Sequence, residues 1–137
     1  MNQAYWDEIA SRYDEEILDA VQNDKNGVIR QSIREHADKT RLAADFGCGI
    51  GKSLPLLSRC FSIVDAYDLS NENLELARRK CRRLPNVRYH HRDLSTEDKT
   101  SAQADFAVRT PSATMGEAAT AWSMDLPSTV PRTKPLN

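Results

Sequence analysis

The sequence predicts an α/β fold with a doubly wound, mostly parallel sheet. Short apolar stretches of strand length alternate along the chain with stretches whose apolar residues recur at helical spacing. A glycine-rich turn links the first of these strands to the helix that follows it. The 137 residues suit one domain with a single modest core. Strands that alternate with helices run parallel and are joined by right-handed crossovers, so we expect ligands at the carboxyl ends of the strands.

The composition narrows the class of protein. With a formal net charge of -1 and 28% charged residues, the chain has no overall field that would attract nucleic acid or an anionic membrane. No apolar run is long enough to cross a bilayer, and Met1 is not followed by the basic stretch and then the apolar stretch of a signal peptide. We therefore expect a cytoplasmic protein without a membrane partner. The scattered cysteines, Cys48, Cys60 and Cys81, indicate reduced thiols, and we expect no metal site.

Two helices are expected before the first strand. The first is amphipathic, and its apolar residues at helical spacing are Trp6, Ile9, Ala10, Tyr13, Ile17 and Val21. Acidic Asp7 and Glu8 near its start suit the positive end of a helix dipole. The polar residues 22–27 end this helix, and a second one follows, with one face lined by Val28, Ile29, Ile33 and Ala37.

The rest of the predicted domain alternates strands with helices. In chain order, we expect a strand at 40–46, a helix at 51–60, a strand at 61–67, a helix from 70, a strand at 87–91 and a weaker strand at 104–108. Pro55 falls in the first turns of one helix, where a missing N–H costs least. Ser70 is a good N-cap for the next helix, and Pro85 stops it. The apolar stripe of that helix consists of Leu74, Ala77, Cys81 and Leu84.

Residues 109–137 differ in character from the rest of the chain. They are rich in Thr, Ser and Ala, carry four of the six prolines and show no periodicity. We expect a domain over 1–108 whose sheet is incomplete in its C-terminal half, followed by a low-complexity, disordered tail. The strand at 104–108 is then expected to present an unpaired edge, through which copies of the chain self-associate.

The turn after the first strand is a ligand-binding candidate, and it runs Asp45-Phe46-Gly47-Cys48-Gly49-Ile50-Gly51. Glycines there let the backbone approach a ligand and aim free N–H groups at a negative group. A phosphate loop of the Walker kind requires glycine where this chain has Phe46, and a dinucleotide fingerprint requires glycine where it has Lys52. The residues fit an acid-x-Gly-x-Gly-x-Gly pattern instead.

This loop, with Asp68 ending the second strand, Asp93 ending the third, and the helix at 6–14, resembles the class I, Rossmann-like S-adenosylmethionine-dependent methyltransferases. The resemblance covers 5–108, so the family's seven-stranded fold is expected to be truncated after the fourth strand. It implies an enzyme that uses S-adenosylmethionine as cofactor and methylates an acceptor, which we expect to be a small molecule. It identifies no catalytic residue, and a shortened, inactive isoform that keeps part of the cofactor site, or acts through a partner, is the alternative.

The resemblance also implies roles for residues. Gly47, Cys48 and Gly49 pack against the methionine part of the cofactor, and Asp45 contributes to its amino end. Asp68 accepts hydrogen bonds from both ribose hydroxyls, each a charge-assisted bond of roughly 1.5–3 kcal/mol. The complete set of cofactor-binding residues expected is Tyr13, Asp45, Gly47, Cys48, Gly49, Asp68, Leu69, Asp93 and Leu94. Within it, Asp93 and Leu94 read the adenine, and Tyr13 closes over the cofactor.

Other interpretations of these residues stay open. Taken singly, Asp45 would cap a strand end, Asp68 would pair with Arg88 or another surface base, and Tyr13 at helical spacing would belong to the core. A basic run raises the hypothesis of a nucleic-acid surface, although a solvated helix face opposite the apolar stripe is favoured. The run consists of Arg78, Arg79, Lys80, Arg82 and Arg83.

Overall fold

The computed structural model describes residues 3–10, 24–93, 104–109 and 122–124. Its helices and strands are, in chain order, α1 (Gln3–Ile9), α3 (Val28–Glu35), β1 (Asp38–Phe46), α4 (Leu54–Cys60), β2 (Phe61–Asp68), α5 (Asn71–Lys80), β3 (Val87–His91), β4 (Phe106–Arg109) and β5 (Trp122–Met124). None of the helices described is long and apolar enough to cross a membrane.

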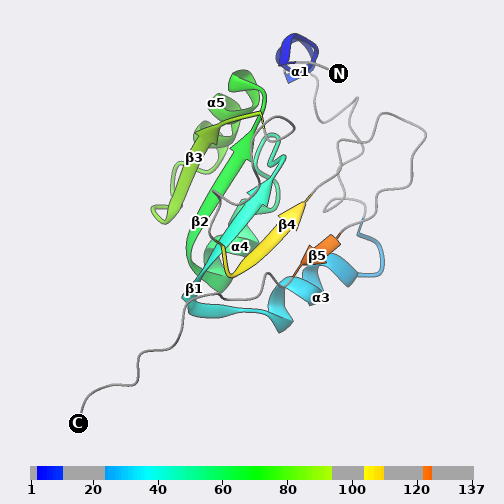
Figure 1. Cartoon of the computed structure of the whole chain (residues 1–137), viewed down its shortest axis with the longest axis vertical. Coiled ribbons are helices and arrows are strands. Elements are labelled where there is room, and N and C mark those ends of the chain that lie inside the picture. The colour runs from blue at the N-terminus through cyan, green and yellow to red at the C-terminus, as the bar shows by residue number, and fades with distance from the viewer. Residues whose placement is uncertain (1–2, 11–23, 94–103, 110–121, 125–137) are drawn as a thin grey trace.

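The strands form one sheet in the order β3-β2-β1-β4-β5 (Figure 1). β1 pairs in parallel with both β2 and β4, and β2 pairs in parallel with β3. This mostly parallel α/β sheet confirms the predicted fold class. Successive strands leave β1 first on one side and then on the other, so the carboxyl ends of β1 and β4 flank a topological switch point, where open sheets of this class bind ligands.

β5 corrects one expectation about the tail. It runs antiparallel to β4, with Ala107 opposite Met124 and Val108 opposite Ser123. The prediction that β4 presents an unpaired edge is therefore wrong, and β4 is not the edge available for self-association. A ladder needs only backbone N–H and C=O groups, so three extended residues suffice to pair without any periodic pattern. The rest of 109–137 lies outside the described residues.

The N-terminal helices differ in part from the prediction. α1 spans Gln3–Ile9, and the segment that holds Tyr13 and Val21 lies outside the described residues. In α3, Ile33 is buried as predicted, but the side chain of Val28 is 64% exposed. Residues four apart share a helix face, so Ile29 and Ile33 face the core together, whereas Val28 is rotated away. The helix ends before Ala37, which is exposed.

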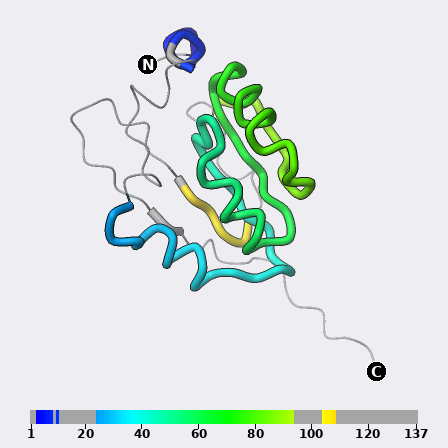
Figure 2. Tube along the Cα trace, turned by 180° about the vertical axis from the view of Figure 1, so that it is seen from behind, coloured from blue at the N-terminus to red at the C-terminus, as the bar shows by residue number. Residues whose placement is uncertain are grey.

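The later elements confirm most of the predicted local signals. Pro55 lies at the start of α4, and the Ser70 hydroxyl caps α5 by accepting a hydrogen bond from the Asn73 backbone N–H at 3.1 Å. α4 begins at Leu54 rather than 51, because Gly51 adopts a left-handed φ of 86°. Helices α4 and α5 cover the same face of the sheet, the nearer face in Figure 2.

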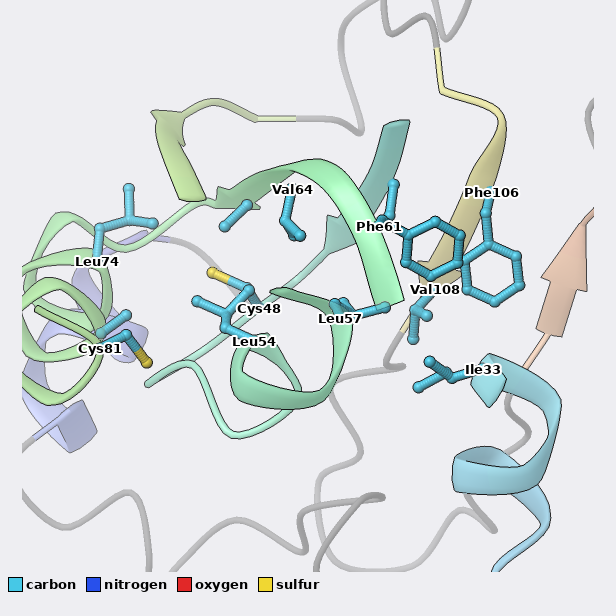
Figure 3. Packing of buried hydrophobic residues seen from close by; sticks show 13 residues of the cluster. Ile33, Cys48, Leu54, Leu57, Phe61, Val64, Leu74, Cys81, Phe106 and Val108 are labelled. Atoms are coloured by element: carbon cyan, nitrogen blue, oxygen red, sulfur yellow. The ribbon is translucent and has the colours of Figure 1, made fainter. Parts of the chain in front are cut away.

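The core lies between this face and helices α3, α4 and α5 (Figure 3). It includes a stack of Phe61, the first residue of β2, on Phe106, the first residue of β4, with ring centroids 5.0 Å apart and planes 15° apart. Both rings are almost completely buried, and Ile33 from α3 belongs to the same cluster. These contacts join β2, β4 and α3 into one unit.

Candidate functional site

The glycine turn lies at the carboxyl edge of the sheet, between β1 and α4. Gly47, Gly49 and Gly51 all have positive φ, at 77°, 53° and 86°. Only glycine adopts such angles without strain, so the sequence pattern follows directly from the path of the backbone.

The N–H groups of this turn are used inside the protein. Those of Gly47 and Cys48 both donate to the carbonyl oxygen of Tyr67, at 2.9 and 3.0 Å. The N–H of Gly49 donates to Oδ2 of Asp68 at 2.8 Å, and that of Gly51 to the Cys48 carbonyl at 3.0 Å. The expectation that the turn aims free N–H groups at a negative ligand is therefore wrong for these four amides, because the end of β2 already supplies their acceptors.

Asp68 joins the glycine turn to the start of α5. Its Oδ2 accepts the Gly49 N–H, and its Oδ1 accepts the Ser70 N–H at 2.9 Å and the Asn73 Nδ2 at 3.4 Å. Burial raises the pKa of this carboxyl, and the hydrogen bonds from Ser70 and Gly49 oppose that effect. The alternative in which Asp68 pairs with Arg88 is wrong, since both guanidinium contacts of Arg88, at 2.6 and 2.7 Å, go to Asp65.

Asp45 lies at the end of β1, just before the turn, and Cys48 lies within the turn. The Asp45 side chain is fully buried and accepts a hydrogen bond from the Ser53 hydroxyl, at the N-cap of α4. Cys48 is buried as well. Desolvation, followed by the nearby charges of Asp45 and Asp68, raises the pKa of its thiol well above the ordinary range. A thiol held protonated in this way packs as a small apolar group and is no nucleophile.

Helix α1 packs against the same region. Trp6 is buried and clusters with Ile50 of the glycine turn and with Leu69, directly after β2. Oδ1 of Asp7 accepts a hydrogen bond from the Ser70 hydroxyl at 2.5 Å. Helix α1 is therefore held against the glycine turn and the residues after β2 by one apolar and one polar contact.

Most of the predicted site residues come together at this edge. The structure gathers Asp45, Gly47, Cys48, Gly49, Asp68 and Leu69 there. Asp93 follows close by, because the N–H of the residue before it, Arg92, donates to the Asp68 carbonyl at 3.0 Å. Tyr13 and Leu94 lie outside the described residues.

Sequence reasoning included the helix at 6–14 in the resemblance, but it named none of Trp6, Asp7 and Asn73 as a neighbour of the site. Asp7 and Ser70 are 63 residues apart, so no local pattern pairs them. Asn73 left only a weak signal, a polar residue next to Leu74 on the inner side of α5, where it is 1% exposed.

The basic run occupies the last turn of α5 and the residues just after it. Its members Arg78, Arg79, Lys80, Arg82 and Arg83 are all exposed. The Arg78 guanidinium lies 5.2 Å from the centre of the Tyr89 ring. The cations near the end of the helix also suit its dipole. The inner side of the same segment faces the glycine turn, where the Cys81 thiol donates to the Gly51 carbonyl at 3.5 Å, whereas the basic side chains face solvent.

We expect Gly51→Ala to destabilise the protein by about 1–3 kcal/mol. A Cβ at this position would lie 3.0 Å from Leu54 Cδ1 and 3.2 Å from both Ala77 Cβ and Cys81 Sγ. Urea unfolding followed by circular dichroism measures the loss. Gly27→Ala is the matched control, since Gly27 has a similar φ of 68° but nothing within 4 Å of the added carbon. Equal losses in the two variants would show that backbone strain alone, and not packing of the turn on α5, requires glycine at 51.

Comparison with known proteins agrees with this architecture. The family model described as a methyltransferase domain matches residues 43–121. No curated protein sequence matches the chain. Among solved structures, a DhpI complex with SAH has 22% identity and a TM-score of 0.64 over 79% of this chain and 50% of that one. A DhpI complex with SAM and HEP has 25% identity and a TM-score of 0.60 over 77% of this chain and 47% of that one.

A third similar structure is SMU.1697c, a putative methyltransferase from Streptococcus mutans in complex with SAH, with 23% identity and a TM-score of 0.51 over 64% of this chain and 55% of that one. The chain thus spans about half the length of the solved structures that it matches. The matched family region includes the end of β1, the glycine turn, Asp68 and β4, and it covers more than half of the chain. The chain therefore belongs to the methyltransferase-domain family and has its class I, Rossmann-like fold.

Proposed function

We propose that this chain binds S-adenosylmethionine at the carboxyl edge of its sheet and serves methyl transfer to a small-molecule acceptor. The observation that carries the proposal is the pairing of the glycine turn with two buried carboxylates, Asp45 and Asp68, in a chain of this family. The solved complexes of DhpI and SMU.1697c with SAH or SAM support the cofactor, and the DhpI complex that also contains HEP supports a small acceptor.

The electrostatics of the turn favour this ligand over a nucleotide phosphate. A phosphate needs free backbone N–H groups or cations, but the amides of Gly47, Cys48 and Gly49 already donate within the protein. Carboxylates nearby would repel a phosphate further. They suit the sulfonium and ammonium groups of S-adenosylmethionine, which are both positive.

The proposed residue roles are those that the family resemblance implies. Gly47 and Gly49 would offer backbone that lacks side chains to the methionine part, and Asp45 would contribute to its amino end. Asp68, with Leu69, would hold the ribose. Its two oxygens offer about four lone-pair sites, and the three hydrogen bonds that they accept within the protein leave room for a further donor. Asp93 and Leu94 would read the adenine, and Tyr13 would close over the cofactor.

When bound, S-adenosylmethionine supplies a methyl group that is already activated. The chain therefore needs to align this methyl group with the acceptor, and it does not need to activate it. Alignment of two reactants is worth effective molarities of about 10⁵ M or more. The rigid turn, held by the hydrogen bonds to Tyr67 and Asp68, provides a fixed surface for this purpose. Trp6 on Ile50 excludes water from one side of the turn.

Calorimetry tests the cofactor directly. We expect S-adenosylhomocysteine to bind the full chain at least about tenfold more tightly than ATP or NAD, a difference of about 1.4 kcal/mol. Val28→Ala, on the exposed side of α3, is a control that should bind S-adenosylhomocysteine like the wild type. Tighter binding of ATP or NAD would show that the proposal is wrong.

A second candidate is a protein that keeps the cofactor site without turnover, acting through a partner. It is favoured by the short antiparallel β5 beside β4. A transfer assay with methyl-labelled S-adenosylmethionine and a panel of small acceptors distinguishes the two candidates. Labelled product supports the enzyme, whereas cofactor binding without product supports the second candidate.

A further inference from the structure

Asn73 carries a buried acceptor that the fold does not use. The residue lies in the first turn of α5 and is 1% exposed. Within the described part of the chain, its side-chain Oδ1 is buried without a hydrogen-bond partner. Folded proteins satisfy almost all buried polar atoms, because an unpaired one retains the full cost of its lost hydration. An apolar side chain of similar size would serve packing better, so packing does not explain asparagine here.

The orientation of the Asn73 amide is fixed. Its Nδ2 lies 3.4 Å from Oδ1 of Asp68, and its backbone N–H donates to the Ser70 hydroxyl at 3.1 Å. A flipped amide would place oxygen against the carboxylate, which is unfavourable. Asp7 holds the same turn from outside through the Ser70 hydroxyl. The oxygen is therefore preorganised beside Asp68, at the edge where the glycine turn ends.

We propose that Asn73 is a specificity residue, whose Oδ1 accepts a hydrogen bond from an uncharged donor of the bound nucleoside. The inference rests on the proposed function and adds a residue to it. Asp68 and Asn73 then offer two adjacent acceptors, a carboxylate and an amide, to a ligand with neighbouring donors. A ribose hydroxyl and the exocyclic amine of adenine share this chemistry. A buried acceptor rejects a ligand that lacks the donor, because binding would leave the acceptor unpaired.

The first test compares Asn73→Leu with Asn71→Leu. Asn71 is the exposed asparagine at the start of the same helix, so it controls for composition and helix propensity. We expect Asn73→Leu to bind S-adenosylhomocysteine at least about tenfold more weakly than the wild type, which is about 1.4 kcal/mol. Its melting temperature should be unchanged or higher, since an unsatisfied buried acceptor is removed. Asn71→Leu should keep the wild-type affinity.

Ligand analogues identify the donor. Wild type and Asn73→Leu are titrated with S-adenosylhomocysteine lacking the 2′ hydroxyl, the 3′ hydroxyl or the exocyclic amine. The analogue that lacks the donor read by Asn73 should bind both proteins equally, whereas the other two should still prefer the wild type. This coupling separates a direct contact from a general disturbance of the site.

A measurement on the unaltered chain covers the case in which Asn73→Leu does not fold. The ¹³C resonance of the Asn73 side-chain carbonyl should move downfield on adding S-adenosylhomocysteine, while that of Asn71 stays in place. Equal affinity of wild type and Asn73→Leu, or an unmoved Asn73 resonance at saturation, would overturn the inference and leave the proposed function standing. Failure of the wild type to bind S-adenosylhomocysteine would overturn both.

Discussion

Replacing Phe61 with alanine is expected to lower the free energy of unfolding by about 3–5 kcal/mol. The ring is 0% exposed and stacks on Phe106 with centroids 5.0 Å apart. Its removal opens a cavity where β2, β4 and α3 meet, and the neighbours around it relax only in part. A domain of this size has a total stability of roughly 5–15 kcal/mol, so the loss would leave much of the protein unfolded at moderate temperature.

Urea unfolding monitored by circular dichroism measures this loss. Val28→Ala is the matched control, since its side chain is 64% exposed and should change stability by less than about 0.5 kcal/mol. A loss below about 1 kcal/mol for Phe61→Ala would mean that the aromatic stack contributes little to the stability of the core.

Replacing Asp68 with alanine is expected to destabilise the protein by at least about 2 kcal/mol, in addition to weakening S-adenosylhomocysteine binding by about 2–3 kcal/mol. The N–H groups of Gly49 and Ser70, and the Asn73 amide, all donate to this carboxylate. They would lose their acceptor in a buried environment. Asp68→Asn is the matched control, because its one remaining oxygen satisfies part of these donors and should retain part of the stability.

Unfolding of the ligand-free variants and calorimetry of the folded ones measure the two effects separately. If Asp68→Ala were as stable as the wild type, the carboxylate would not hold the glycine turn to α5. If its affinity were also unchanged, Asp68 would have no place in the cofactor site.

The pH dependence of stability follows from the raised pKa of Asp68. In the folded chain this pKa lies above its ordinary value of 3.8, because burial disfavours the charged form. Between those two values the folded state binds more protons than the unfolded state, so the contribution of Asp68 to stability falls as pH rises through the folded pKa. The wild type should therefore gain stability relative to Asp68→Asn on acidification from about pH 8 toward pH 4. A difference between the two proteins that is constant with pH would contradict the raised pKa.

Local sequence determined most of the elements of this fold. The Ser70 cap, Pro55 at the start of α4, and the β3 strand at Val87–His91 all lie where the sequence predicts them. Each signal acts over a few adjacent residues, since caps, proline and apolar periodicity depend on neighbours in the chain. The glycine turn and Asp68 were predictable for a related reason, because the carboxyl ends of parallel strands converge at one edge.

Only the tertiary structure decided which groups form hydrogen bonds with each other and which strands pair. The acceptors of the glycine-turn amides, the bond between Asp7 and Ser70 across 63 residues, and the pairing of β4 with β5 have no local signature. The outward position of Val28 likewise depends on which face of α3 meets the core. Such contacts are set by packing between segments distant in the chain, where any nearby donor or acceptor can serve. For the same reason, only the folded chain shows that Asn73 buries an oxygen for which the residues described supply no partner.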